Sequence, residues 1–496
     1  MSVSLLLEMA VSANPDREAV VCDDIRWTTS ELDDLARRGA GLVHESGVRS
    51  IAYLGTGGAM LPLLLFASAH AGLPFVPLNY RLSAEGLHAL LRRLPNPLIL
   101  VDAEYRDVVE GIGGPCIGSE EFVASAATTE PVSVSCDPDD VAVLLFTSGT
   151  TSEPKAVELS HANLTSYITG SVDFASAESA DVALISVPPY HIAGVSAALS
   201  NLYAGRTAVY LRRFDPVGWV HAVRTQQVTT ATVVPTMLDR IVTVLENQAT
   251  ALPSLRNLAY GGAKAPQPLV RKALDLLPDV GFANAYGLTE TSSTIAVLTP
   301  EDHRSAHRSA DPEVAERLAS VGRPLPGVEI EIPSADGRVV PSGQVGELFV
   351  RGAQVSRRYA ELGSVLDEHG WFPTKDLACI DDGGYLFIAG RSDDTIIRGG
   401  ENIAPAELED VLIEHPAVRE VAVVGAEDRE WGQIIVAVIV PEPGVEPDPE
   451  ELRAYTRDRL RGSRTPDRIV FGDHLPTSPT GKVLRREIVG QLGAQI

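Results

Sequence analysis

One short stretch of the chain, residues 144–157, combines the residue types that a phosphate-binding loop needs. It reads LLFTSGTTSEPKAV. The apolar run from Val141 to Phe146 predicts a short buried strand, and hydroxyl side chains around Gly149 follow it. Hydroxyl and backbone N–H groups donate to phosphate oxygens, glycine lets the backbone approach closely, and Lys155 adds a positive charge. The spacing is not that of a Walker A loop, so by itself the stretch predicts either a phosphate site or a Ser/Thr-rich surface turn.

Further segments with polar residues follow this stretch along the chain. They read NAYGLTETSS from Asn284, GWFPTKDLACIDDGGYLFIAGRSDDTIIRGGENIAPAELEDVL from Gly370, and PTSPTGKVLRREI from Pro476. Together with TSGTTSEPKAV, they resemble the ordered motifs of the adenylate-forming superfamily of acyl-CoA synthetases, adenylation domains and luciferases. The chain is most similar to bacterial fatty-acid or aryl-acid CoA ligases. Because the matches keep the family's order and cover the chain nearly end to end, they are far more specific than any single motif.

The resemblance implies a role for each matching residue. Lys482 would bridge the carboxylate and the α-phosphate, Thr289 would contact the α-phosphate, and Glu290 would bind Mg²⁺, which prefers hard carboxylate oxygens. His191, in PPYHIAGV, would position the acyl carboxylate or gate the thiol path, although a lone histidine is more often structural. The residues implied for ATP and CoA binding are Thr147, Ser148, Gly149, Thr150, Thr151, Lys155, Gly262, Ala263, Asn284, Tyr286, Gly287, Asp376, Arg391, Arg398, Gly399 and Gly400. Those implied for the acyl pocket are His191, Val195, Gly261, Gly262 and Thr291.

The same resemblance implies a two-step ligase that uses ATP, Mg²⁺ and coenzyme A. A carboxylic acid, expected to be a fatty acid, would attack ATP to give acyl-AMP and pyrophosphate, and the CoA thiol would then take the acyl group. An N-terminal AMP-binding domain is expected over residues 1–392, and a C-terminal domain over residues 393–496 would rotate about Asp393 between the steps.

The order of apolar and polar runs predicts the elements that position these residues. Residues 51–55, 74–78 and 97–102 read as strands, with helices over 60–71 and 84–93 between them. Residues 104–140 show little periodicity and are expected to be connecting structure. The fold class expected is α/β: a large N-terminal domain of two βα-layered sheets, a small β-barrel-like subdomain with a hairpin at Asp336-Gly337, and a small, mobile α+β C-terminal domain.

Composition narrows the class of protein. A chain of 496 residues is longer than one compact core usually serves, so two or more domains are expected. With 41 basic and 66 acidic residues the net charge is −25, which argues against nucleic-acid binding. The N-terminus predicts a short amphipathic helix rather than a signal peptide, and residues 61–78 predict a buried helix and strand rather than a membrane span. The cysteines are widely spaced without metal-ligand spacing and indicate reduced thiols in a cytoplasmic protein; they are Cys22, Cys116, Cys136 and Cys379.

Several positions depart from the family pattern. Ser152 and Ala156 replace glycines in the phosphate loop, and a side chain at a position that needs φ > 0 would cost about 1 kcal/mol. Lys375 stands where a glycine usually precedes Asp376, and it either adds a cation near the nucleotide or points outward. Lys264 stands where family members often carry a small or apolar residue, and its direction is left open.

Alternative functions remain beside the CoA ligase. An acyl-AMP ligase would load the acyl group onto a carrier protein, and a nucleotide-binding pseudoenzyme would bind ATP without turnover, as Ser152 and Ala156 suggest. No aspartate that could hold an α-amine follows YHIAGV, which argues against an amino-acid substrate. The expected partners are therefore the acid, ATP and CoA, with a carrier protein or a homodimer as open alternatives.

Overall fold

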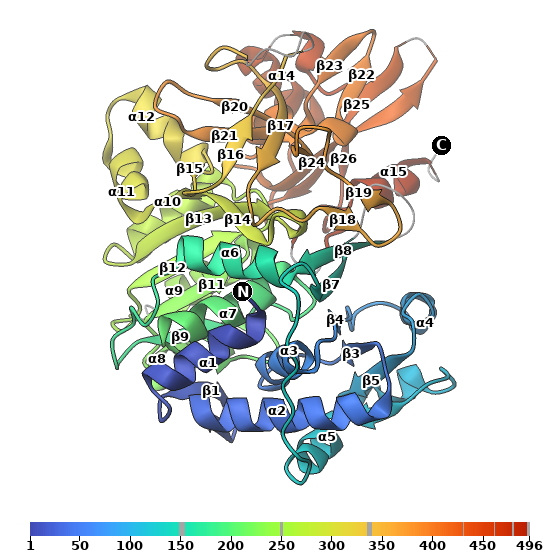
Figure 1. The fold of residues 1–496 in the computed structure, drawn as a ribbon. Coiled ribbons are helices and arrows are strands. Elements are labelled where there is room, and N and C mark those ends of the chain that lie inside the picture. Colours follow the sequence, from blue (N-terminus) through green and yellow to red (C-terminus); the bar gives the residue numbers. More distant parts are fainter. Residues whose placement is uncertain are drawn as a thin grey trace.

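The computed structural model of the protein describes residues 1–147, 154–248, 251–334, 340–429, 431–460, 462–478 and 481–493 (Figure 1). Its first large sheet has parallel strands at the centre and antiparallel strands at both edges. Across the sheet, the described strands are β15 (Arg323–Pro324), β14 (Ser293–Leu298), β13 (Gly281–Leu288), β12 (Asn257–Gly261), β11 (Thr230–Val233), β9 (Val182–Ile185), β10 (Thr207–Tyr210), β1 (Glu18–Cys22) and β2 (Ile25–Thr28). The helices whose apolar sides share a core with this sheet are α8 (Pro216–Thr225), α9 (Pro235–Gln248) and α10 (Gln267–Leu276).

The second large sheet follows the same plan. Its described strands, in order, are β19 (Gly363–Ser364), β18 (Arg358–Tyr359), β8 (Lys155–Ser160), β7 (Val141–Thr147), β4 (Phe75–Pro77), β3 (Ser50–Leu54), β5 (Pro97–Val101) and β6 (Cys116–Gly118). One continuous core joins the two large sheets through helices packed between them. These helices are α1 (Val3–Ala13), α2 (Thr29–Ser46), α3 (Met60–Ala71), α6 (His161–Ser171) and α7 (Ile192–Ala204). Two further helical segments, α4 (Ala84–Leu91) and η1 (Ala103–Val109), share a separate core with β3 and β5.

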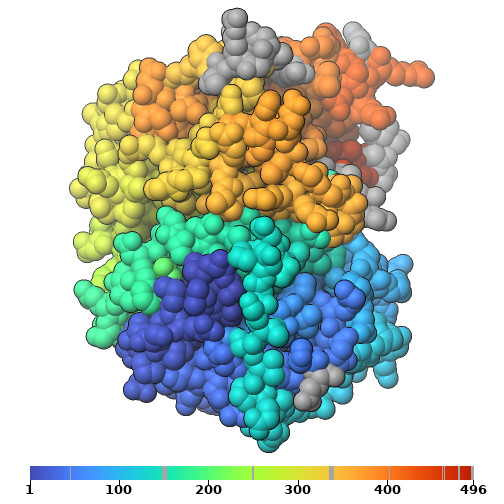
Figure 2. Space-filling model, viewed as in Figure 1, coloured from blue at the N-terminus to red at the C-terminus, as the bar shows by residue number. Residues whose placement is uncertain are grey.

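Most of the predicted N-terminal elements are present, but the prediction for residues 104–140 is wrong in its first part. That stretch continues η1 and then forms β6 and α5 (Ser119–Ala126), with β6 pairing in parallel with β5. β6 has no buried residue and α5 buries few, so neither shows a clear apolar period in the sequence. Only the later part is connecting structure, and Figure 2 shows it in teal, running over the blue N-terminal surface.

A small antiparallel sheet packs on the edge of the first large sheet around a core of its own. Its strands are β16 (Glu329–Glu331), β17 (Gly346–Arg351), β20 (Phe372–Ile380) and β21 (Leu386–Arg391). The neighbouring helical segments are η2 (Thr289–Thr291), α11 (Pro300–Arg308), α12 (Pro312–Glu316) and η3 (Arg317–Ala319). The hairpin predicted at Asp336-Gly337 lies outside the described residues.

The C-terminal part is an α+β unit with two apolar clusters drawn only from residues 396–492. After η4 (Ser392–Asp394), its strands are β22 (Ile396–Arg398), β23 (Glu401–Ile403), β24 (Val418–Asp428), β25 (Gly432–Pro441) and β26 (Arg468–Phe471). Its helical segments are α13 (Pro405–Leu412), α14 (Pro449–Arg459), η5 (Gly462–Arg464) and α15 (Arg485–Gly493). The α/β class with a large N-terminal and a small C-terminal domain is thereby confirmed, while the boundary at Asp393 stays a prediction. In the part of the chain that the structure describes, no helix is both long and apolar enough to cross a membrane.

Candidate active site

The predicted phosphate loop connects β7 to β8 where these strands pair. Thr147 lies opposite Lys155 in antiparallel register, and the Thr147 hydroxyl donates to the Lys155 carbonyl at 3.4 Å. The two ends of the loop are therefore held together by the strand pair. The other residues predicted for this loop lie outside the described residues; they are Ser148, Gly149, Thr150, Thr151 and Ser152.

The end of the loop is fixed by contacts from distant parts of the chain. Arg93 donates to the Pro154 carbonyl at 2.8 Å and pairs with Glu361, which accepts from the backbone N–H of Ala156 at 3.2 Å. Ala156 is buried in β8, opposite Phe146, and is not among the described residues with a left-handed φ. A side chain at this position therefore carries none of the backbone strain that a required glycine would imply.

Glu290, the predicted magnesium ligand, lies in η2 directly after Thr289. Its Oε1 accepts a hydrogen bond from the Tyr359 hydroxyl at 2.6 Å. Burial, and then the charge of Glu290, raise the pKa of Tyr359, so this hydroxyl remains a donor. Lys155 Nζ lies 5.5 Å from the centre of the Tyr359 ring. Tyr359 was not predicted, because RRYAELG carries no motif in sequence, yet it connects the proposed phosphate and magnesium residues.

The surroundings of Glu290 fit a magnesium ion that takes most of its ligands from the nucleotide. Within the described part of the chain, no group of three or more His, Cys, Asp or Glu side chains gathers as a ligand set. Mg²⁺ is usually held by one or two carboxylates together with substrate phosphates and water, and it dehydrates reluctantly. A single carboxylate steadied by Tyr359 is therefore a suitable protein contribution to magnesium bound with ATP.

Asp376 is the centre of a buried hydrogen-bond network. The Tyr286 hydroxyl donates to Oδ2 at 2.5 Å, and Arg391 Nη1 donates to Oδ1 at 3.1 Å. Asp376 and Arg391 face each other across the antiparallel pair of β20 and β21, so strand register sets this contact. Burial raises the pKa of Asp376, and the charge of Arg391 opposes the shift. The network leaves the Tyr286 side chain fixed in orientation beside the predicted ribose carboxylate.

Lys482 comes to this network from near the end of the chain. Gly481 before it has φ 75°, and a Cβ there would lie 2.4 Å from a side-chain carbon of Thr236, so this loop packs against the start of α9. The Lys482 side chain keeps contact with water, but the surrounding protein and then Arg391 lower its pKa, while Asp376 raises it. Lys482 is therefore near enough to Asp376 and Arg391 for their charges to interact.

The predicted acyl-pocket residues cluster at the ends of β12 and β13 and at the start of α7. A Cβ at Gly261 would lie 2.1 Å from the Ala285 carbonyl oxygen, so no side chain fits there, and Gly262 has φ 82°. Val195 has no exposed surface and belongs to the core, while the buried Thr291 hydroxyl donates to the Ser293 carbonyl at 2.7 Å. The remaining predicted residues of these strand ends, on or directly after β12 and β13, are Ala263, Asn284 and Gly287.

The residues predicted to line the CoA path make their described contacts within the C-terminal part. Arg398 Nη2 donates to Asp467 at 2.7 Å, and its guanidinium lies 4.5 Å from the Trp431 ring. Gly399 and Gly400, with φ 58° and 84°, form the turn between β22 and β23. The described contacts of the predicted nucleotide residues include those of Lys155 and Glu290 with Tyr359 and of Asp376 with Tyr286 and Arg391, whereas those of this hairpin lie within the C-terminal part.

Lys375 adopts a backbone conformation that normally favours glycine. Its φ is 62°, and its Nζ lies 3.5 Å from Oδ2 of Asp393. We expect Lys375→Gly to be more stable than Lys375→Ala by about 1 kcal/mol, because both lose the exposed ion pair but only alanine keeps the left-handed strain. Urea denaturation of the two variants measures this difference, and equal stabilities would contradict the argument.

His191 occupies the N-cap position of α7 without a side-chain capping bond, and its Nε2 is buried without a hydrogen-bond partner among the described residues. Burial, and then Arg81, lower its pKa from 6.5 to about 4. A neutral imidazole at physiological pH suits a residue that positions the carboxylate.

This shift predicts a pH-dependent contribution of His191 to stability. Between pH 4 and 6.5 the unfolded chain binds the proton more readily than the folded protein does. The contribution of neutral His191 to the free energy of unfolding is therefore fully present above pH 6.5 and is lost as the pH falls toward 4. We expect wild-type stability to drop more than that of His191→Gln between pH 7 and 4.5, measured by urea denaturation; parallel curves would contradict this.

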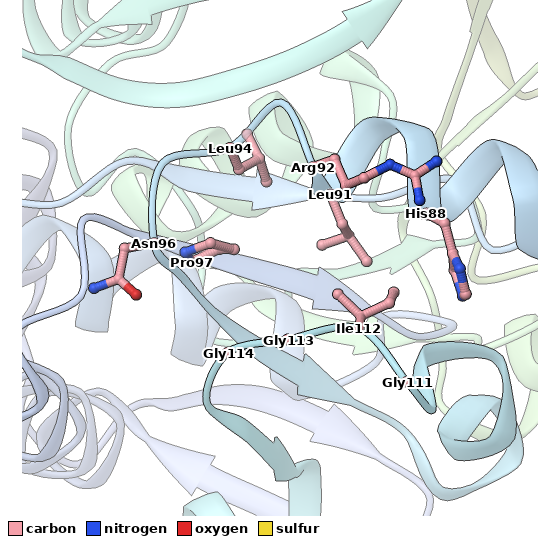
Figure 3. Close-up of a pocket in the computed structure, with 10 residues that line it drawn as sticks. All are labelled: His88, Leu91, Arg92, Leu94, Asn96, Pro97, Gly111, Ile112, Gly113 and Gly114. Atoms are coloured by element: carbon pink, nitrogen blue, oxygen red, sulfur yellow. The ribbon is translucent and has the colours of Figure 1, made fainter.

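A separate pocket of about 280 Å³ lies at the end of α4 (Figure 3). Residues from α4 and the loop around Gly113 line it, including His88, Leu91 and Ile112. None of the predicted site residues is among those that line this pocket, and it has no part in the site above.

Comparison with known proteins follows the same division of the chain. Residues 7–360 match the model of the AMP-binding enzyme family, and residues 407–482 match that of the AMP-binding enzyme C-terminal domain. A fatty acid–[acyl-carrier-protein] ligase, ScoC, of Streptomyces coeruleorubidus is 34% identical over 494 residues, covering 96% of this chain and 93% of that protein. A feruloyl-CoA synthase of an Amycolatopsis species is 34% identical over 488 residues, covering 97% of both proteins. The o-succinylbenzoate CoA synthetase of Bacillus subtilis, solved with its acyl-adenylate intermediate, is 31% identical with a TM-score of 0.85 and 97% of both chains covered.

Proposed function

Since this chain belongs to the AMP-binding enzyme family and is an acid–thiol ligase that uses ATP, Mg²⁺ and coenzyme A, we propose that it activates a fatty acid as acyl-AMP and transfers the acyl group to CoA. The observation that carries this proposal is the network of Asp376, Tyr286 and Arg391, with Lys482 within electrostatic reach of Asp376 and Arg391. Lys482 lies more than 90 residues after Asp376 and Arg391 in the sequence, and together these groups would supply the charges that adenylation requires.

The proposed mechanism depends on orientation and charge rather than on a strong base. Adenylation brings a carboxylate to a phosphate, so the site must offset negative charge and hold both groups in line. Asp376 would accept from the ribose hydroxyls while Arg391 and Tyr286 hold it in place. Lys482 would contact the carboxylate and the α-phosphate, and neutral His191 would orient the acid. Magnesium, held by Glu290, would supply further positive charge to the phosphates.

The polar groups beside the predicted acyl site support an apolar acid over an amino acid. The Ser196 hydroxyl lies 3.2 Å from that of Ser293, and the Thr291 hydroxyl is used by backbone carbonyls. Because these hydroxyls already have partners, they are poor candidates for holding an α-amine. A fatty acid is named for one relative and an aryl acid for the other, so both acid classes belong in the test.

A carrier protein is the second candidate acceptor, and the relative ScoC, named for such a protein, favours it. In that case acyl-AMP would form equally well, but its transfer would require a phosphopantetheine-bearing protein rather than free CoA.

The test is ATP-dependent pyrophosphate release over a panel of fatty, aryl and amino acids. Each acid is assayed with CoA, with a carrier protein and with no thiol. Turnover that requires CoA and is greatest for fatty acids is the expected result. A maximum for aryl acids would show that the substrate is an aryl acid rather than a fatty acid. A requirement for the carrier protein would show that this protein, rather than CoA, accepts the acyl group. No pyrophosphate release with any acid would reject the ligase proposal.

A further inference from the structure

Lys264 and Asp410 form an ion pair between the N-terminal and C-terminal parts of the chain. Lys264 follows β12 in the turn GGAKAP, and Asp410 lies on α13. The Lys264 Nζ and Asp410 Oδ2 atoms are 2.5 Å apart, and the two side chains are 47% and 56% exposed. Lys264, whose direction the sequence left open, therefore points toward the C-terminal part.

The packing of α13 explains why this pair depends on how the two parts are arranged. Ala406 and Asp410 are four residues apart and therefore share one face of the helix. A Cβ at Gly390, on β21, would lie 3.8 Å from the Cβ of Ala406. The face of α13 that packs on β21, just before Arg391, thus also presents Asp410 to Lys264.

The remainder of this contact region contains charges of both signs. Asp239 on α9 and Glu420 on β24 both have a raised pKa, with partial loss of solvent as the largest cause, and the nearby cations Lys272 and Arg419 oppose the shift of Asp239. Glu442 adds to the shift of Asp239, Asp239 adds to that of Glu420, and Arg419 opposes both shifts. The contact between the two parts therefore combines attraction and repulsion, and within it Lys264 and Asp410 form a direct ion pair.

We propose that Lys264 is a positioning residue whose ion pair with Asp410 favours the arrangement in which Lys482 reaches the adenylate site. This inference rests on the proposed function, because its kinetic consequence is a shift between adenylation and thiol transfer. An exposed ion pair is weak, so its loss should change the balance of the two arrangements by about two- to five-fold.

The first experiment tests the contact without any activity measurement. A carbodiimide joins an amine directly to a carboxylate in contact with it, and mass spectrometry identifies the joined peptides. We expect a cross-link between Lys264 and Asp410 in the protein alone. Lys272 and Glu246, 2.7 Å apart and 48% and 39% exposed, form a matched pair within the N-terminal part and serve as the internal reference. Formation of only the reference cross-link would overturn the proposal.

The second experiment measures the two half-reactions separately, with the acid that gives the most pyrophosphate in the panel. Lys264→Ala should lower the ratio of adenylation to CoA transfer from supplied acyl-adenylate by about two- to five-fold. The charge-swapped variant, Lys264→Asp with Asp410→Lys, should restore the ratio, because it rebuilds the pair with opposite polarity. Lys272→Ala should leave the ratio unchanged.

Equal ratios for Lys264→Ala and Lys272→Ala, or failure of the charge swap to restore the ratio, would overturn the positioning role. Failure of the proposed function has a different signature: the wild-type protein would release no pyrophosphate, whether or not the cross-link between Lys264 and Asp410 forms.

Discussion

Lys482→Ala should lower the rate of adenylation by about 10²- to 10³-fold and leave thiol transfer from supplied acyl-adenylate largely intact. Lys482 lies within electrostatic reach of Asp376 and Arg391, where its charge would offset the approach of carboxylate to phosphate. The second half-reaction starts from a formed adenylate and does not need that charge. Pyrophosphate exchange measures the first step, and acyl-CoA formation from synthetic acyl-adenylate measures the second.

A suitable control is Arg486→Ala, which removes an exposed positive charge on α15 of the same C-terminal part. It should leave both half-reactions close to wild type. Equal losses in the two half-reactions for Lys482→Ala would show that the residue is not specific to adenylation and would remove the proposed division of roles.

Asp376→Asn should raise the KM for ATP by about 10- to 100-fold, the loss expected when a charged hydrogen-bond acceptor is neutralised. The carboxylate accepts from Tyr286 and Arg391 and is 5% exposed, so an amide of the same shape changes the charge with little change in packing. Steady-state kinetics with varied ATP measures the effect. Asp381→Asn, on a carboxylate 2.9 Å from Arg317 and just after the same strand, is the matched control and should leave the KM unchanged.

The same substitution should also change how stability depends on pH. Burial holds the pKa of Asp376 above its ordinary value, so the folded protein binds this proton more tightly than the unfolded chain does. Wild-type stability therefore falls as the pH rises through the interval between the two pKa values, whereas Asp376→Asn lacks this loss. In urea denaturation, the free energy of unfolding of the variant relative to that of the wild type should rise from pH 3.5 to 7. A relative free energy of unfolding that falls over this range would contradict the conclusion that the ionised Asp376 carboxylate costs stability and is retained for nucleotide binding.

The fold was predictable wherever an element was long and its apolar pattern clear. The helix of residues 60–71 and the strand of residues 97–101 are buried along their whole length, and continuous apolar runs indicate this directly. β6 and α5 were missed, because β6 has no buried residue and α5 buries only Ser119, Phe122 and Ala126, so neither shows a clear apolar pattern.

The sequence alone did not show which departures from the family pattern would strain the backbone. Ala156 was expected to strain the phosphate loop if a glycine were needed, yet it lies in an ordinary strand position. Lys375 does occupy a left-handed backbone conformation, and its side chain points to Asp393. The residue type alone does not report φ, because the neighbouring strand pairs and turns set the backbone at each position.

The sequence by itself determined the family, the α/β class and the identity of most candidate site residues, because these depend on residue types in a fixed order along the chain. Only the tertiary structure decided which of them meet. The contact of Tyr359 with Glu290, the network of Tyr286 around Asp376, and the pairing of Lys264 with Asp410 join residues from 69 to 146 positions apart. Such contacts follow from strand register and from the packing of one part of the chain on another, which no local pattern of residues encodes.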